Sequence, residues 1–132
     1  MSIRPKYADA IFSGEKRFEF RRTIFRRPVQ VVVVYITSPV KRVIGEFDVE
    51  EIISDTVESL WRRAKHSAGI ERDDFFEYFR GRSAGHAISI GSVRLYPKPL
   101  EIAAALGTRP PQSWVYLREA PTEMLGTPAR NR

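Results

Sequence analysis

The chain has 132 residues, of which 22 are Lys or Arg, 16 are Asp or Glu and none is Cys. This length predicts one domain with a substantial apolar core, and the lack of cysteine excludes disulfides, thiolate metal ligands and a cysteine nucleophile. No apolar run reaches the roughly 20 residues of a membrane span, and the first residues lack an apolar leader, so we expect a cytoplasmic protein without a membrane partner.

The formal net charge of +6 is concentrated near the start of the chain. Residues 1–28 hold eight Lys or Arg and three Asp or Glu, whereas residues 46–58 hold six Asp or Glu and no base. A basic surface favours an anionic partner such as nucleic acid. By charge alone, an ordinary solubilising surface explains the excess equally well.

A short helix is predicted over residues 4–14. Pro5 suits its first turn, and Gly14 suits a left-handed C-terminal cap. Between them Ala8 and Ile11 fall on one helical face. The helix therefore has an apolar side for packing.

A short strand is predicted next, over residues 17–21. Because side chains alternate along a strand, its two phenylalanines face a core while Glu19 and Arg21 face the other way. We expect Lys16 to swing over the strand and join Glu19 and Arg21. The result is a cationic pocket with one built-in carboxylate.

Two longer strands are predicted after a basic linker. The β-branched run at residues 29–36 favours a strand that is covered on both faces, although such a run does not exclude a buried helix. A turn at Ser38-Pro39 separates it from a second strand over residues 41–53. In that strand Gly45 is expected to mark a bulge or bend.

Two short helices are predicted between residues 55 and 80. Asp55 is the expected N-cap of the first, in a capping box with Glu58. The second, over residues 72–80, has acids in its first turn. Helix-turn-helix reading of DNA is disfavoured, because Phe75 and Phe79 indicate packing onto a sheet and phosphates repel the acids that open the second helix.

The rest of the chain predicts a bent strand over residues 85–96, with a break at Gly91, and a short helix over residues 100–106. A last strand is predicted over residues 112–117. Residues 119–132 are polar and contain two prolines and a glycine, so we expect a disordered tail there.

Neither a metal ion nor another cofactor is expected. His66 and His86 are the only histidines, and they fall on different predicted elements with no cysteine to join them. The sequence has neither a glycine-rich phosphate loop nor a Gly-x-Ser-x-Gly elbow. P-loop nucleotide hydrolysis and serine-hydrolase chemistry are therefore disfavoured.

Three sequence blocks, in the same order, resemble the ASCH domain, a branch of the PUA-like superfamily. They are Gly14-x-Lys16-x-x-Glu19-x-Arg21, the Ser38-Pro39 turn with Ile44-Gly45-Glu46-Phe47, and Pro110-Pro111-Gln112-Ser113-Trp114-x-Tyr116. The resemblance covers residues 1–118. It implies an α+β fold, namely a small PUA-like mixed β-barrel with flanking short helices, and an association with RNA.

The favoured hypothesis is that a basic cleft beside the first strand binds RNA, another nucleic acid or a nucleotide-like small molecule. Glu19 would accept a hydrogen bond from a base. The candidate phosphate contacts are Arg4, Lys16, Arg21 and Arg22. The candidates for neutral hydrogen bonds are Ser38, Gln112 and Ser113, and those for stacking are Tyr35, Trp114 and Tyr116.

The alternative is a hydrolase with Lys16 and Glu19 as catalytic residues. Some ASCH proteins are ribonucleases, which implies Glu19 as the base on a 2′-hydroxyl and Lys16 and Arg21 as stabilisers of the phosphorane. Others are amidohydrolases of acylated cytidine, in which the motif lysine assists a threonine three residues later. Glu19 stands at that position here, and a carboxylate attacks an amide poorly.

Two further interpretations need no chemistry. A salt-bridged network of Lys16, Glu19 and Arg21 would only shape the pocket, and the acidic strand at residues 46–58 would serve a protein-interaction module. Recognition of a ligand is favoured over catalysis. The sequence makes no prediction of oligomeric state.

Overall fold

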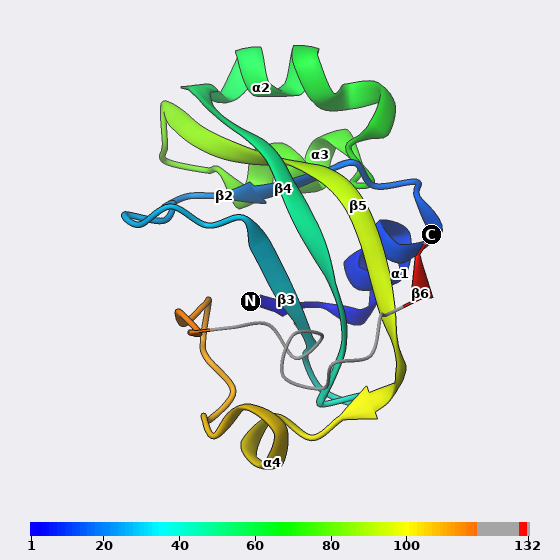
Figure 1. Ribbon diagram of the computed structural model, residues 1–132. Helices are drawn as coiled ribbons and strands as arrows, with labels where there is room; N and C mark the ends of the chain where they lie inside the picture. The colour runs from blue at the N-terminus through cyan, green and yellow to red at the C-terminus, as the bar shows by residue number, and fades with distance from the viewer. Residues whose placement is uncertain (119–129, 132) are drawn as a thin grey trace.

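The computed structural model describes residues 1–118 and 130–131; residues 119–129 and 132 lie outside the description. The strands form one mixed sheet in the order β1-β3-β4-β5-β2, with β6 beside β5 (Figure 1). The β1–β3 ladder is parallel, and the other described ladders are antiparallel. The strands are β1 (Ser2–Ile3), β2 (Phe18–Arg21), β3 (Val31–Ile36), β4 (Arg42–Thr56), β5 (Ala84–Leu100) and β6 (Arg130–Asn131).

The sheet has a seam between its two end strands, β1 and β2. No backbone ladder joins these strands among the described residues. The side chain of Arg21, at the end of β2, crosses the seam instead: its Nη2 donates to the carbonyl oxygen of Ser2 in β1 at 3.0 Å. The predicted α+β class is therefore confirmed, whereas closure of the sheet into a barrel is not shown.

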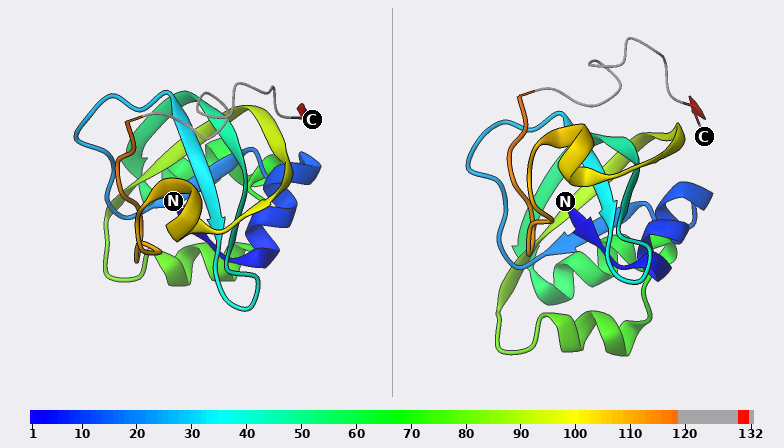
Figure 2. Two further views of the ribbon diagram at one scale, coloured as in Figure 1. Left: turned by 60° about the horizontal axis from the view of Figure 1, so that its bottom comes forward. Right: turned by 90° about the horizontal axis from the view of Figure 1, so that it is seen from below.

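Short helices cover the two ends of the sheet. Figures 1 and 2 place α2 and α3 together at one end and α4 at the opposite end. The helices are α1 (Pro5–Ser13), α2 (Val57–Ala64), the 3-10 turn η1 (Lys65–Ser67), α3 (Arg72–Tyr78) and α4 (Ile102–Leu106). All four predicted helical regions are confirmed.

Helix α1 packs on the sheet and leads into the Lys16 segment. Its buried residues Ala8 and Ile11 join one core cluster with Val34 of β3 and Phe47 of β4. The helix ends at Gly14, whose φ of 89° lies in the left-handed region, as the sequence predicts. Burial of this apolar face fixes where the chain enters β2.

A second core lies beneath α2 and α3. Phe20 of β2 meets Phe75 of α3 edge to face, with ring centroids 4.9 Å apart, and Phe79 and Leu60 are buried in the same cluster. Such aromatic pairs stabilise a core beyond their buried area. The apolar face of α3 is therefore turned into the protein, as expected for packing helices and not for a DNA-reading pair.

Two local predictions need correction. The N-cap of α2 is Thr56, not Asp55, because the Thr56 side chain accepts from the Ser59 N–H. Asp55 instead accepts from the Thr56 N–H and the Ser59 hydroxyl. Strand β5 does not end at residue 96, as predicted, but continues through Pro97 and Pro99 to Leu100. It can do so because a register shift opposite β4 leaves those prolines outside the regular ladder.

The strand predicted over residues 112–117 is wrong. Residues 112–117 belong to no strand, and residues 112 and 113 lie in a bend. This stretch runs beside β1, which has only two residues, and one backbone hydrogen bond joins them, from Ser2 N–H to Ser113 O at 2.8 Å. The tail predicted over 119–132 falls largely outside the described residues and stays a prediction; Arg130 and Asn131 pair with β5.

Gly45 lets α1 and β5 approach β4 closely. A register shift lies beside it, which confirms the predicted irregularity. A Cβ at this position would collide with the carbonyl oxygen of Arg94 and lie 2.8 Å from Cε1 of Phe12. The close approach therefore depends on glycine.

We predict that Gly45→Ala lowers the free energy of unfolding by about 1–3 kcal/mol, the usual cost of forcing an atom into a packed core. Urea denaturation measures it. Gly91→Ala is the matched control, because its Cβ would meet nothing nearer than Asp48 at 3.3 Å. Equal stabilities of Gly45→Ala and the wild type would contradict the packing described.

Candidate functional site

A cleft of about 590 Å³ lies along the seam between β1 and β2. Its walls come from the start of the chain, α1, β2 and α3. The residues that line it are Ser2, Ile3, Arg4, Lys6, Tyr7, Lys16, Glu19, Phe20, Arg21, Arg22, Ile70, Asp74, Glu77 and Tyr78. Five of the predicted site residues are therefore in one place, namely Arg4, Lys16, Glu19, Arg21 and Arg22.

Lys16 is held inside the wall of the cleft. Its side chain is 2% exposed, and its Nζ donates to the carbonyl oxygen of Ala68 at 2.7 Å. The ammonium also lies 5.3 Å from the ring centroid of Tyr7 and 4.9 Å from that of Phe20, within reach of cation–π attraction. The expectation of a mobile lysine that swings over β2 is wrong.

This environment makes the Lys16 ammonium easier to deprotonate. Burial lowers its pKa from 10.5 to about 8; the Glu19 carboxylate opposes the shift and the Arg21 guanidinium adds to it. Burial dominates because it penalises the charged form. Lys16 is therefore a cation at neutral pH that releases its proton in mildly alkaline solution.

Glu19 and Arg21 form a nearly buried ion pair. Arg21 Nη2 donates to Glu19 Oε2 at 2.8 Å, and Arg21 Nη1 donates to the Ser113 hydroxyl at 3.2 Å. No salt bridge to Lys16 is present in the described part of the chain. The predicted three-residue network is thus a two-residue pair beside a separately anchored lysine.

One donor of Arg21 is unused. Its Nε is buried and, among the residues that the structure describes, has no hydrogen-bond partner. An unpaired buried donor is costly, so such groups are rare in folded proteins and mark places where a water, an ion or a ligand completes the bonding. The N–H of Arg21 Nε is therefore an unmatched donor buried in the wall of the cleft.

The rim of the cleft is divided by charge. Arg4 and Lys6 are exposed near its start, and Arg22 stacks on Tyr78 with its guanidinium carbon 4.5 Å from the ring centroid. Arg22 Nε also donates to the Tyr78 carbonyl oxygen at 2.8 Å. Asp74 and Glu77 of α3 also line the cleft. An anionic ligand is therefore expected on the side of Arg4, Lys6 and Arg22, away from these acids.

Three predicted contacts lie differently. Ser38 and Gln112 are exposed and do not line the cleft; Ser38 sits in the β3–β4 turn, before a cis peptide bond to Pro39. Ser113 enters the site only through its bond to Arg21. The stacking candidates Tyr35, Trp114 and Tyr116 line a different pocket.

Two acids of the stretch at residues 46–58 are paired within the sheet, whereas Glu50, Glu51 and Glu58 are exposed. Glu46 is 2% exposed and accepts from both Arg94 and Tyr96. Asp48 accepts from Arg94 at 2.6 Å, and this hydrogen bond lowers the pKa of the Asp48 carboxyl. These two acids therefore join β4 to β5 through Arg94.

The histidines offer no metal site. His86 Nδ1 lies 2.7 Å from the Ser54 hydroxyl, and His66 is exposed in η1. Within the described residues no group of three or more His, Cys, Asp or Glu is placed to hold a metal ion. None of the helices described is long and apolar enough to cross a membrane.

Two parts of the site were not anticipated. Tyr7, from the exposed part of α1, contacts the Lys16 ammonium, and Gly69 backs the lysine stem, where a Cβ would overlap the Lys16 side chain. Gly69 has a φ of 64°. A glycine at the end of a helical region is a signal for positive φ, but nothing local relates it to Lys16.

The fold and the cleft define a small mixed-sheet domain with a basic cleft along the seam between β1 and β2. The model of the ASCH domain matches residues 1–112. The chain therefore belongs to the ASCH domain family, as the three sequence blocks indicate.

Relatives agree with this assignment. An ASCH domain-containing ribonuclease of Zymomonas mobilis is 32% identical over 130 residues, which cover 95% of this chain and 87% of that protein. The crystal structure of ASCH from Zymomonas mobilis superimposes with a TM-score of 0.86 at 29% identity and covers 98% of this chain and 94% of that one.

Other relatives are longer. An ATP synthase subunit alpha of Ureaplasma parvum is 33% identical over 119 residues, and a large ribosomal subunit protein uL22 of the same species is 31% identical over 119 residues. Each match covers 89% of this chain but only 15% and 38% of the respective relative. The similarity thus concerns one domain of each.

The low pKa of Lys16 makes stability depend on pH. Between about pH 8 and the unfolded-state pKa of 10.5, the unfolded chain holds a proton at Lys16 that the folded chain has released, so the free energy of unfolding rises with pH. Relative to Lys16→Met, the wild type should gain about 2 kcal/mol between about pH 8 and pH 10.

Chemical denaturation at a series of pH values measures this difference. Lys98→Met, which removes an exposed lysine outside the cleft, is the control and should show no such gain. A difference between the wild type and Lys16→Met that stays flat or shrinks as the pH rises would contradict the buried, desolvated position of Lys16.

Proposed function

We propose that this protein binds single-stranded RNA in the seam cleft and cleaves it there. The observation that carries the proposal is the arrangement at Arg21: a buried guanidinium with an unpaired Nε, flanked by Glu19 and Lys16. A guanidinium in the wall of a concave, basic cleft suits a phosphate oxygen. The Zymomonas ribonuclease supports RNA as the substrate class.

The chemistry needs only groups of this cleft and of the RNA. Glu19 takes the proton of a 2′-hydroxyl, the 2′-oxygen forms a bond to the adjacent phosphorus, and the bond from phosphorus to the 5′-oxygen breaks. Lys16 supplies the proton that the departing 5′-oxygen takes. Arg21 stabilises the extra negative charge of the phosphorane. The products are a 2′,3′-cyclic phosphate and a 5′-hydroxyl.

Binding without cleavage is the second candidate. The Glu19 carboxylate accepts from Arg21 at 2.8 Å, and a carboxylate has room for further hydrogen bonds. In that case Glu19 accepts a hydrogen bond from a nucleobase and selects among bases. The two candidates differ in whether removal of the Glu19 charge abolishes cleavage or changes the preferred base.

We predict that Glu19→Gln lowers kcat for RNA cleavage by about 100-fold or more, the usual contribution of a general base, and changes RNA affinity only slightly. Cleavage of a labelled RNA, with identification of the cyclic phosphate end, measures it. Glu77→Gln is the matched control, because Glu77 lines the same cleft but is exposed on α3.

Three outcomes separate the candidates. Full activity of Glu19→Gln would contradict its role as the base. RNA binding without any cleavage by the wild type, with a changed base preference in Glu19→Gln, would make the protein a reader of RNA. Release of acetate from N4-acetylcytidine by the wild type, but not by Lys16→Met, would establish amidohydrolase chemistry instead.

The bases on the rim should make RNA binding depend on salt. Each phosphate neutralised on single-stranded nucleic acid contributes about 0.7 to the slope of log affinity against log salt concentration. Arg4→Ala and Arg22→Ala should therefore each flatten the slope by about that amount in filter-binding assays. Arg42→Ala, an exposed arginine at the start of β4, is the control, and an equal effect there would contradict binding at this cleft.

A further inference from the structure

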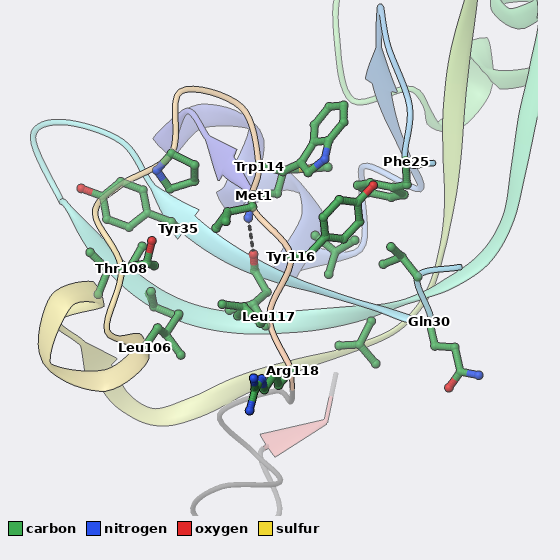
Figure 3. A pocket seen from close by; sticks show the side chains of 18 of the residues that line it. Met1, Phe25, Gln30, Tyr35, Leu106, Thr108, Trp114, Tyr116, Leu117 and Arg118 are labelled. Atoms are coloured by element: carbon green, nitrogen blue, oxygen red, sulfur yellow. Dashed lines mark hydrogen bonds between the residues drawn. The ribbon is translucent and has the colours of Figure 1, made fainter. Parts of the chain in front are cut away.

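A second pocket, of about 310 Å³, lies beside the cleft and shares no lining residue with it. It is formed by β3, the loop before β3 and the chain from Thr108 to Arg118. Figure 3 shows Phe25, Trp114 and Tyr116 on one side of it and Tyr35, Leu106 and Thr108 on the other. Its volume is in the range of small-molecule sites and is large enough for a nucleobase.

The walls of this pocket suit a flat, aromatic group. Phe25 meets Trp114 edge to face at 5.2 Å between ring centroids, and it meets Tyr116 at 6.5 Å. The floor consists of aliphatic side chains of β3 and α4. Single-stranded RNA is recognised in this way, by bases that leave the stack and lie against aromatic side chains.

The charge around the pocket is positive. No acidic residue is among those described as lining it, whereas Arg118 lines it, and the Arg27 guanidinium lies 4.5 Å from the ring centroid of Tyr116. Arg26 N–H donates to the Tyr116 hydroxyl at 3.0 Å and fixes this part of the loop. An uncharged apolar ligand would need none of these arginines, but a nucleotide needs cations for its phosphate.

The backbone of residues 114–117 adds polar groups to the pocket. The N–H groups of residues 114–117 find no acceptor among the described residues, because this stretch belongs to no strand. Backbone donors at the edge of an apolar pocket are the groups that orient a small ligand. They suit the carbonyl and ring-nitrogen acceptors of a base.

The pocket and the cleft are two sides of one wall. The Ser2 hydroxyl, on the cleft side, donates to the Pro111 carbonyl oxygen at 2.6 Å, and Pro111 lines the pocket. Arg22 lines the cleft and Phe25 lines the pocket, and three residues of backbone span at most about 11 Å. One RNA strand can therefore reach both sites along the basic loop.

We propose that this pocket binds an unstacked base of the same RNA strand whose phosphate lies at Arg21. Arg27 and Arg118 meet the phosphates next to that base. The inference rests on the proposed binding of RNA at the cleft and adds a second subsite, which sets affinity and the minimum length of a good substrate. The bond that is cleaved stays at the cleft.

The test uses Trp114 as a reporter. The chain has two tryptophans, so Trp61→Phe leaves Trp114 as the sole indole. Titration of this variant with a single-stranded 2′-O-methyl RNA, which cannot form the cyclic product, should give a saturable change in fluorescence. In the cleavage assay, Tyr116→Leu should raise KM for an oligonucleotide about tenfold, as expected for loss of a stacking partner, with kcat unchanged and cleavage of a dinucleotide unaffected.

Failure of this inference is distinguishable from failure of the proposed function. RNA that is bound and cleaved without a change in Trp114 fluorescence would overturn the second subsite alone. An equal loss of dinucleotide and oligonucleotide cleavage in Tyr116→Leu would overturn it too, since the tyrosine would then act on the fold or the cleft. A wild type that neither binds nor cleaves RNA would overturn both proposals.

Discussion

The side chain of Arg21 spans the seam between β1 and β2, the two end strands of the sheet. The cleft exists because no backbone ladder among the described residues fills that seam. Its guanidinium reaches the Ser2 carbonyl, the Ser113 hydroxyl and the Glu19 carboxylate. Backbone pairing would leave no opening between β1 and β2. A side-chain bridge holds the two edges together while the space around it stays open to a ligand.

The bridge has an energetic cost that explains its surroundings. Removing a guanidinium and a carboxylate from water is unfavourable unless each is well paired, and here the pairing is incomplete at Arg21 Nε. Lys16 adds a third ionisable group close by, with its own acceptor at Ala68. A ligand that supplies negative charge and acceptors would therefore stabilise the cleft as well as occupy it.

Local features of the fold could be predicted because short-range chemistry determines them. The helical face of Ala8 and Ile11, the cap at Gly14 and the alternation through β2 each depend on residues within a few positions. The ordered motifs also placed Lys16, Glu19 and Arg21 in one site. The local expectations are confirmed by α1 and β2, and Lys16, Glu19 and Arg21 all line the cleft, which leaves their role a prediction.

The missed features depend on partners far along the chain. The acceptor of Lys16 is a backbone carbonyl 52 residues away, and no side-chain pattern encodes it. The stretch at residues 112–117 has the composition of a strand, but its neighbour β1 is only two residues long, so it has almost nothing to pair with. The aromatic side chains there therefore line a pocket instead of a sheet face.

The most direct test of this account is a crystal structure of the protein with an RNA whose 2′-hydroxyl is absent at one position, so that the chain is bound but not cleaved. We expect a phosphate oxygen within about 2.7–3.1 Å of Arg21 Nε, with the nucleotide lying along the seam between β1 and β2. RNA bound on another surface, with the donor of Arg21 Nε still unpaired, would contradict the central role assigned to this arginine.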